Sequence, residues 1–485
     1  MKDIKNYFST MLFFVFPIIM ANVYYSDDLN RAMNGYTFWG IDGRPLADYL
    51  MIIINFSNHL TDLSPLPLLL ATLLLSFTFY LCYKKCFRSL REGKLIPLSL
   101  LFSPFILEIF SYKFDVLTIS ASLSLCFSFL ILRKTVTILQ LLTLTASTIG
   151  IYGLYQPSIN VALVFISLTS FIELHEKEPP SYIIKLLSLR LSAIIIGSII
   201  YLKIILPFFF NGAEEANHPG IANHLLNAIM HNATIYYEFF TINLAPIHGE
   251  AITKIVFIVT LFSSAIISIN YYKYFKNYGA IVIAVIAIVA IPLTFIASMA
   301  SLLLLENPIE NFPRVYIGIN GLTLFCFALF CLACKNKWLN IAVFVFFGLY
   351  VLTFSYSYGN ALRMQDELNQ QLAQEIKLAT KDISENSVNM MFNGKPPSSP
   401  VNANASINYP LIQSLVINYY YNWFGSHTYL AMHGLNQNYP DFTKEEVSTY
   451  LHNYCNSNLI YHSSRMNVYS NHLNIVVDFS KTQCE

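Results

Sequence analysis

Charged residues are scarce in this chain of 485 residues. Asp, Glu, Lys and Arg make up 12% of it, and hydrophobic residues make up 55%, whereas a soluble protein carries about 25% charged residues. Several apolar runs are long enough to cross a bilayer, so the sequence predicts a polytopic membrane protein. The net charge is only +1 and no basic patch occurs, so nothing indicates a nucleic-acid partner.

Common catalytic and metal-binding motifs are also absent. The chain lacks G-x-x-x-x-G-K-[ST], which excludes a P-loop ATP-driven motor. It lacks H-E-x-x-H and any spaced Cys and His set for zinc, so we assign no metal ligands and expect no cofactor. The Asp-x-Asp pattern of nucleotide-sugar transferases is missing too, because Asp27 and Asp28 are adjacent.

Eleven apolar segments are predicted to span the membrane, giving an α-helical transmembrane domain over residues 1–355. Their approximate bounds are 7–23, 65–83, 95–111, 115–132, 135–150, 159–174, 189–209, 252–270, 279–299, 316–334 and 338–355. The first segment follows Lys2 and Lys5, as a signal peptide would. Its apolar run is slightly long and no clear A-x-A site follows, so we interpret it as an uncleaved anchor.

The distribution of Lys and Arg sets the orientation, because cytoplasmic loops carry an excess of them. With the N-terminus inside, sixteen lie on the inner side: Lys2, Lys5, Lys84, Lys85, Arg88, Arg91, Lys94, Arg133, Lys134, Lys177, Lys185, Arg190, Lys273, Lys276, Lys335 and Lys337. Five lie in outer loops before residue 356: Arg31, Arg44, Lys113, Lys254 and Arg314. An odd number of spans then places the C-terminus outside.

The composition changes after Ser355, and we predict a small α+β domain over residues 356–485. Residues 365–386 are polar with helical character, and residues 444–455 predict a short helix. Residues 393–410 are rich in Pro, Ser and Asn, which favours a linker or a long loop. The apolar run at 473–479 predicts a strand.

Ionisable residues gather where the spans reach the outer face. Asp27, Asp28 and Arg31 begin the first outer loop, and if this stretch is helical all three side chains share one face. The Asp42-Gly-Arg44-Pro sequence predicts a turn that projects a guanidinium. Later outer segments add further groups: Glu108, Lys113, Asp115, Tyr155, Gln156, Glu306, Glu310 and Arg314.

Two interpretations of these outer residues are open. In the first they are structural: Arg and Lys reach the interface, Tyr24, Tyr25 and Tyr112 form an aromatic belt, and Lys113 pairs with Asp115. In the second they form a site for an anionic lipid-linked substrate, because Arg binds phosphate in a bidentate fork. A carboxylate there could accept the proton of an attacking sugar hydroxyl.

The stretch SDDLNRAMNGYTFWGIDGRPLADYL resembles the opening of the serotype-converting glucosyltransferases of the Gtr clusters of enterobacteria and their phages. SYKFD (111–115), LYQPSIN (154–160) and FPRV (312–315) follow in the same order. The resemblance covers most of residues 1–355. It implies a GT-C-like membrane glycosyltransferase of the bacterial inner membrane, with a cytoplasmic N-terminus and a periplasmic C-terminus.

This resemblance implies a reaction and its partners. The enzyme would transfer glucose from undecaprenyl-phosphate glucose to the repeat unit of lipid-linked O-antigen, on the periplasmic side. A companion flippase and a donor synthase would supply the donor. The C-terminal domain, which matches no motif, would suit acceptor recognition.

The same resemblance implies roles for individual residues. The catalytic acidic residue would be Asp27 or Asp28. Donor or phosphate contacts would be Arg31, Arg44, Lys113 and Arg314. Sugar or acceptor contacts would be Asp115 and Gln156, and Glu108 is a further candidate.

Two other functions share some of these features. A transporter or flippase of lipid-linked sugars would have similar spans and outer arginines, but we find neither an inverted repeat nor broken midplane helices. An O-antigen polymerase usually carries a large periplasmic loop between spans. Here the large polar part is the C-terminal tail.

The cysteines suggest one disulfide. Six of the eight lie in predicted spans or near their inner ends: Cys82, Cys86, Cys126, Cys326, Cys331 and Cys334. Only Cys455 and Cys484 fall in the predicted periplasmic tail, where thiols are oxidised. We therefore predict a Cys455–Cys484 disulfide. Two unpaired cysteines are the alternative, with Cys484 frayed at the terminus.

Overall fold

The chain forms two compact units. The computed structural model describes residues 2–133, 137–210, 219–244, 249–310, 312–383, 388–471 and 473–481. The first unit contains Met1–Ile19 and Tyr36–Tyr356, and the second contains Met20–Gly35 and Ser357–Glu485. The second unit therefore joins a short N-terminal segment to the C-terminal part of the chain, whereas the predicted domains divided the chain once, after residue 355.

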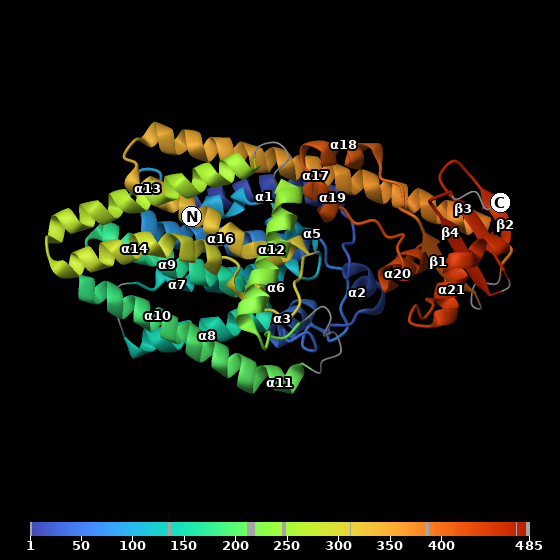
Figure 1. Cartoon of the computed structure of the whole chain (residues 1–485), viewed down its shortest axis with the longest axis horizontal. Coiled ribbons are helices and arrows are strands. Elements are labelled where there is room, and N and C mark those ends of the chain that lie inside the picture. The colour runs from blue at the N-terminus through green and yellow to red at the C-terminus, as the bar shows by residue number, and fades with distance from the viewer. Residues whose placement is uncertain are drawn as a thin grey trace. The chain divides into compact units, whose positions relative to one another are not determined.

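The first unit consists of packed helices. They are α1 (Lys2–Ala21), α3 (Pro45–Asn55), α4 (Leu66–Cys82), α5 (Ile106–Ser111), α6 (Val116–Cys126), α7 (Ser128–Ile131), α8 (Ile138–Leu154), α9 (Ile159–Glu176), α10 (Pro180–Ile200), α11 (Leu206–Phe209), α12 (Leu225–Leu244), α13 (Gly249–Phe275), α14 (Tyr278–Ala297), α15 (Ala300–Leu303), α16 (Ile317–Ala333) and the first part of α17 (Lys337–Ala379). The long helices run alongside one another, whereas α12 crosses them (Figure 1).

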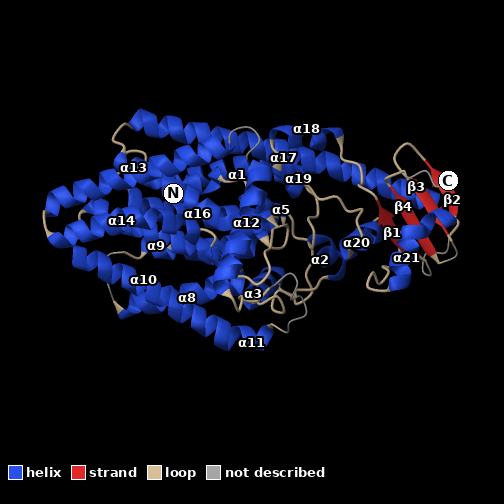
Figure 2. Cartoon of the chain, in the orientation of Figure 1, coloured by secondary structure: helices blue, strands red, loops and turns tan. Residues whose placement is uncertain are grey.

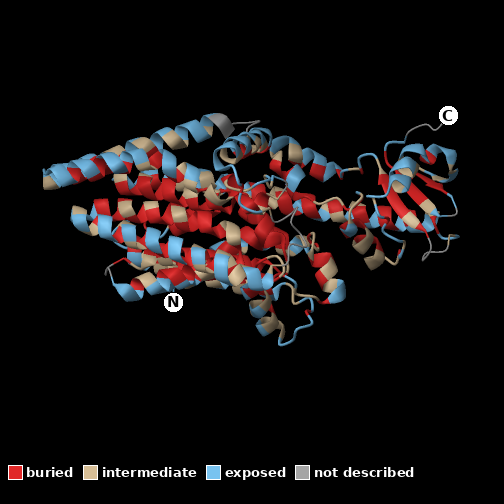
Figure 3. Ribbon diagram, turned by 60° about the horizontal axis from the view of Figure 1, so that its bottom comes forward, coloured by how far each residue is buried: buried red, intermediate tan, exposed pale blue. Residues whose placement is uncertain are grey.

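Eight helices among the described residues are long and apolar enough to cross a membrane. They are Lys2–Ala21, Leu66–Phe87, Gln156–Glu176, Pro180–Phe209, Ala251–Phe275, Tyr278–Ala297, Pro313–Ala333 and Lys337–Ala379. Exposed residues line the outer faces of the long helices (Figure 3), and on α14 they include Ile281, Val285, Val289, Leu293 and Ile296. Such wide apolar exposure fits lipid-facing surfaces.

The predicted count of eleven spans is not confirmed. Three predicted spans correspond to shorter apolar stretches or broken segments. Val116–Ile131 and Ile138–Leu154 are apolar but shorter than the eight. The segment 95–111 is not one helix: a 3-10 helix covers Pro97–Phe102, Ser103 is extended, and α5 starts at Ile106.

A proline and one polar side chain explain this break. Pro104 disfavours helical backbone at Ser103, whose ψ is 131°. The carbonyl groups released by the break are bonded by α16, because Asn320 Nδ2 donates to Leu100 O at 2.8 Å and to Ser103 O at 2.9 Å. Irregular backbone at membrane depth is stable where neighbouring side chains satisfy it in this way.

Small residues bring α16 close to its neighbours. A Cβ at Gly318 would overlap the Ser298 carbonyl oxygen, and a Cβ at Gly321 would lie 3.1 Å from Val161 Cγ1 of α9. Membrane helices associate through van der Waals packing, which favours glycine at such contacts. Asn160 adds a polar contact, since its Oδ1 accepts from Ser301 N at 2.9 Å.

The second unit combines helices with a four-stranded sheet, whose strands are drawn in red in Figure 2. Its helices are α2 (Asp28–Asn34), the end of α17, α18 (Pro400–Asn408), α19 (Leu411–Leu415), α20 (Phe424–Met432) and α21 (Glu445–Asn453). Its strands are β1 (Asn389–Asn393), β2 (Asn458–His462), β3 (Asn467–Ser470) and β4 (Asn474–Asp478). The strand order is β1-β4-β3-β2, and β1 pairs with β4 in parallel while the other pairs are antiparallel.

Alternate residues of the strands face two different cores, as the two-residue period of a strand requires. One core holds Met390, Phe392, Val468, Ile475 and Val477 with residues of α17 and α20. The other holds Met391, Tyr469 and Val476 with Tyr454, and residues of α21 pack against it. The sheet is therefore covered on both faces.

Most local predictions for the tail are confirmed. The predicted helix at 444–455 and strand at 473–479 are α21 and β4, and the helical character of 365–386 reflects the end of α17. The predicted loop at 393–410 was wrong over part of its length, because it contains α18. Ser399 starts that helix by accepting from Asn402 N at 3.2 Å, and Pro400 takes the first helical position.

The predicted disulfide stays a prediction, because Cys484 lies outside the described residues. The six cysteines of the predicted spans are free thiols, and five of them are buried.

Candidate active site

A tight turn in the first unit positions Arg44. Gly43 has φ of +73°, a conformation that glycine adopts most readily, and a Cβ there would lie 2.6 Å from Leu206 Cδ1. Gln156 Nε2 donates to Gly43 O at 2.9 Å, and the Tyr201 hydroxyl donates to the same oxygen. Two other segments therefore hold the turn, and the Gly-Arg-Pro sequence places the Arg44 side chain at the start of α3.

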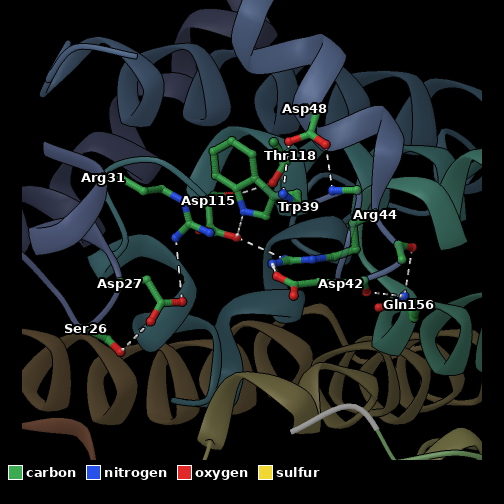
Figure 4. A network of polar contacts seen from close by, with 12 residues as sticks. Ser26, Asp27, Arg31, Trp39, Asp42, Arg44, Asp48, Asp115, Thr118 and Gln156 are labelled. Carbon is green, nitrogen blue, oxygen red and sulfur yellow. Dashed lines mark hydrogen bonds and ion pairs between the residues drawn. The ribbon is translucent and has the colours of Figure 1, made fainter. Parts of the chain in front are cut away.

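The Arg44 guanidinium pairs with a buried carboxylate (Figure 4). Arg44 Nη1 donates to Asp115 Oδ1 at 3.0 Å, and Trp39 Nε1 donates to the same oxygen at 2.9 Å. Asp115 is 4% exposed and Trp39 is fully buried. A charge-assisted bond in such a site is stronger than in water, so Asp115 fixes both side chains.

A second carboxylate orders the backbone just before this turn. Asp48, on the first turn of α3, accepts from Trp39 N at 3.0 Å and from Gly40 N at 2.6 Å. Burial raises the pKa of Asp48, and these two backbone donors oppose that rise. Asp48 thus fixes the segment that carries Trp39.

Two buried donors beside this pair have no hydrogen-bond partner among the described residues. They are Arg44 Nε and the Tyr155 hydroxyl. The Arg44 guanidinium lies 5.9 Å from the Tyr155 ring centroid. Burial, together with Glu108, raises the pKa of Tyr155 well above its ordinary value, so its hydroxyl keeps its proton. Buried unpaired donors are costly in free energy, which suits a site completed by a ligand.

Glu108 and Arg314 come together on neighbouring segments of the same unit. Glu108 is 2% exposed and accepts from Arg314 N at 2.5 Å. The Arg314 guanidinium lies over the Tyr112 ring at 4.4 Å, which is a cation–π contact. Lys113 Nζ lies 3.6 Å from Asp62 Oδ2, a partner that the sequence analysis did not name.

The predicted catalytic carboxylates lie in the second unit and differ in burial. Asp27 precedes α2, and its side chain is 35% exposed and 3.6 Å from Arg31 Nη1. Asp28 is fully buried, and its Oδ2 accepts from Tyr25 N at 3.3 Å. Asp27 and Arg31 are four residues apart at the start of a helix, so they share the face that the sequence predicted.

This N-terminal segment is bound to the C-terminal part of the chain. Tyr25 donates through its hydroxyl to Leu415 O at 2.8 Å, and Tyr419 donates to Tyr24 O at 2.6 Å. Leu29 is buried in the core beneath the sheet. Tyr24 and Tyr25, which the structural interpretation assigned to an aromatic belt, hold the carboxylate segment in this unit.

Three carboxylates at and just after the C-terminal end of α9 form a separate charged cluster. Among the described residues, Glu173, Glu176 and Glu178 place one oxygen each within 4.8 Å of one another. Arg133 lies 3.3 Å from Glu173 and 2.6 Å from Glu176. Because Arg133 already pairs with two of the three carboxylates, we interpret this cluster as a structural ion-pair network and not as a metal site.

Comparison with known proteins assigns the family. The family model for Glucosyl transferase GtrII matches residues 16–309, more than half of the chain. The chain belongs to this glucosyl transferase family. The match includes every predicted site residue from Asp27 to Gln156, and Arg314 lies just beyond it.

A related phage protein matches nearly the whole chain. It is described as an uncharacterized 55.3 kDa protein in the gtrB 5' region of Salmonella phage P22, and it is 26% identical over 455 residues. The match covers 91% of this chain and 92% of the relative. No solved structure matches the chain, so the predicted GT-C fold stays a prediction for this GtrII family member.

Within the GtrII chain, the structure connects the predicted residues of the first unit. Arg44, Asp115 and Gln156 meet around one turn, and Glu108 adjoins Tyr155. Sequence reasoning missed three residues that order this site: Trp39, Asp48 and Asp62. Trp39 and Asp48 flank the predicted Gly-Arg-Pro turn, and that proximity was the available signal.

Proposed function

We propose that this chain transfers glucose from undecaprenyl-phosphate glucose to the O-antigen repeat unit of lipopolysaccharide, on the periplasmic face of the bacterial inner membrane. Membership of a glucosyl transferase family supports the sugar and the reaction class. The phage relative encoded beside gtrB supports the setting of O-antigen modification. Eight long apolar helices support a multi-pass enzyme whose donor is a membrane lipid.

The buried Arg44 guanidinium is the observation that carries the proposal. It is 8% exposed, its Nε has no partner among the described residues, and the Tyr155 hydroxyl beside it is also unpaired. Guanidinium and phenol donors suit the oxygens of a phosphate. In glycosyl transfer the phosphate leaves as an anion, so such donors would stabilise charge that develops in the transition state.

Asp27 is the proposed general base. The acceptor hydroxyl oxygen would attack C1 of glucose, the bond from C1 to the phosphate oxygen would break, and the hydroxyl proton would pass to the Asp27 carboxylate. Undecaprenyl phosphate would leave. Asp27 suits this role better than Asp28, because its side chain is partly exposed whereas Asp28 is fully buried and bonded to the Tyr25 backbone.

The remaining predicted residues support the donor site. Asp115 would orient Arg44, and Glu108 would orient the segment that carries Arg314. Arg31, Lys113 and Arg314 would contribute positive charge near the donor phosphate. A flippase and a donor synthase would supply the glucosyl lipid, and the second unit would bind the acceptor in the periplasm.

Transfer by the purified protein tests this function. The full chain in nanodiscs would be mixed with radiolabelled undecaprenyl-phosphate glucose and lipid-linked O-antigen. We expect label in the O-antigen with wild type, and transfer slower by about 10²-fold or more after Asp27→Asn. Movement of the donor across vesicles without transfer would instead indicate a transporter, and elongated O-antigen chains without glucose would indicate a polymerase.

A further inference from the structure

An open polar groove lies on the sheet side of the second unit. Its volume is about 620 Å³. The lining residues come from α21, the 3-10 turn that follows it and the β3–β4 connection: Glu445, Glu446, Thr449, Tyr450, Asn453, Asn456, Ser457 and Asn471. No role in the proposed chemistry has been given to any of them.

The packing of α21 explains why these residues are presented together. Val447, Tyr450 and Leu451 on one side of the helix pack against the core of Met391, Tyr454, Tyr469 and Val476. The helical period then places Glu446, Thr449 and Asn453 together on a neighbouring face of the helix, where all three are exposed. The groove is therefore the polar face of a helix whose apolar face is fixed to the sheet.

Local bonds fix some lining groups and leave others available. The Tyr450 hydroxyl lies 2.8 Å from Ser457 Oγ, which orients the ring. Asn453 Nδ2 donates to Thr449 O at 3.1 Å, and its Oδ1 has no partner among the described residues. Asn471 Oδ1 accepts from Leu473 N and Asn474 N, which leaves its amide hydrogens for a ligand.

The charge of the lining limits the class of ligand. It contains two carboxylates and no Lys or Arg, so it would repel a phosphate or an acidic sugar. Amide oxygens and carboxylates accept hydrogen bonds from hydroxyl groups, and amide hydrogens donate to them. A tyrosine ring offers an amphipathic surface with one apolar side. This combination suits an uncharged polyhydroxylated chain.

We propose that this groove binds a neutral segment of the acceptor saccharide. The proposal rests on the proposed function for the identity of the saccharide, and it adds the residues that would hold it. Glu446 and Asn453 would accept hydrogen bonds from sugar hydroxyls, and Asn471 would donate to them. Tyr450 would contact the apolar face of one sugar ring.

Direct binding without donor tests the groove. The probe is the O-polysaccharide released by mild acid from the lipopolysaccharide of the strain that carries this gene. Binding to the full chain in nanodiscs would be measured by calorimetry for wild type and for a variant with Glu446→Ala and Asn453→Ala, which removes both acceptor side chains. Each lost hydrogen bond costs about a 2- to 10-fold weakening, so we expect Kd to rise by about 10-fold or more.

Asn404→Ala is the matched control, because Asn404 is an exposed residue of α18 in the same unit. We expect its Kd and the melting temperatures of both variants to equal those of wild type. An unchanged Kd for the double variant, or no binding by wild type, would contradict the proposal that this groove binds the saccharide. Failure of glucose transfer with intact, groove-dependent binding would overturn only the proposed function, since the binding experiment contains no donor.

Discussion

The candidate donor site and the polar groove place polar groups in opposite environments. Around Arg44 the side chains are buried, carry full charges and include unpaired donors. In the groove they are mostly exposed and carry no positive charge. The Arg44 charge is paired with Asp115, so what suits the proposed charged ligand is the donor that stays unpaired among the described residues, Arg44 Nε. Exposed amides cost little and suit reversible recognition.

The two aspartates that begin α2 repeat this contrast at neighbouring positions. Asp28 is fully buried and bonded to the Tyr25 backbone, which indicates a structural role. Asp27 is partly exposed beside Arg31, which suits the proposed role of its carboxylate as general base. Variants of the donor site should therefore change the kinetic constants for the donor, and variants of the groove should change those for the acceptor.

The largest effect is expected for Asp27→Asn. Loss of a general base lowers a rate by about 10²- to 10⁴-fold, so kcat for glucose transfer should fall by about 10²-fold or more while the melting temperature stays unchanged. Radiolabel transfer by purified protein measures the first quantity. Asp28→Asn is the comparison and should mainly lower the melting temperature, since it weakens a buried contact. Near-normal transfer by the Asp27 variant would place the base elsewhere, with Glu108 or Asp115 next.

A smaller effect is expected for Arg44→Lys. Lysine keeps the charge but loses the planar fork and the Nε donor, so the apparent KM for the lipid donor should rise by about 10-fold, which corresponds to ~1.4 kcal/mol. Initial rates at varied donor concentration measure this change. Unchanged donor kinetics would limit Arg44 to holding the Gly-Arg-Pro turn.

Asp115→Asn tests whether Asp115 acts through Arg44. The variant keeps a side chain of the same shape but loses the charge that holds Arg44 Nη1 and Trp39 Nε1. We expect kcat/KM for the donor to fall by about 3- to 10-fold, because the amide oxygen of the variant still accepts a hydrogen bond and only the contribution of the charge is lost. In the double variant with Arg44→Lys, Asp115→Asn should lower kcat/KM little further, because both changes disrupt the same contact between Arg44 and Asp115. Full additivity would show that Asp115 acts independently.

The smallest effect concerns the stability of the second unit at low pH. Burial lowers the pKa of His427 to about 4, from an ordinary value of 6.5. Between these values the unfolded chain binds the proton and the folded chain does not, so stability is full above pH 6.5 and falls as pH drops toward 4. The loss is at most ~3 kcal/mol. Hydrogen exchange of β1 and α20 should show it, and His427→Gln should weaken the dependence.

The sequence predicted the helical membrane unit well and its irregular parts poorly. Long apolar runs such as 279–299 became α14 with little change. The break within 95–111 depends on Pro104 and on Asn320, whose side chain donates to the carbonyl groups that the break leaves unpaired. Asn320 lies more than 200 positions away in the chain, so no local pattern could indicate it. The assignment of Met20–Gly35 to the second unit depended on contacts with Leu415 and Tyr419, which no local pattern contains.

The sequence predicted which residues belong to the candidate site, but not which of them contact one another. Arg44 and Asp115 were both named, but their pairing was not, because they lie 71 positions apart. The structural interpretation paired Lys113 with its neighbour Asp115, and it did not name Asp62, whose Oδ2 lies 3.6 Å from Lys113 Nζ. Trp39 was overlooked because its indole N–H matters only once the Asp115 carboxylate is adjacent.

A crossed kinetic measurement tests most directly whether the two regions serve different substrates. Apparent KM values for undecaprenyl-phosphate glucose and for lipid-linked O-antigen would be determined for wild type, for Arg44→Lys, and for the Glu446→Ala and Asn453→Ala double variant. The account predicts that Arg44→Lys raises only the donor KM and that the double variant raises only the acceptor KM. If both variants raise the same constant, or neither raises any, the division of donor and acceptor binding between the two regions is wrong.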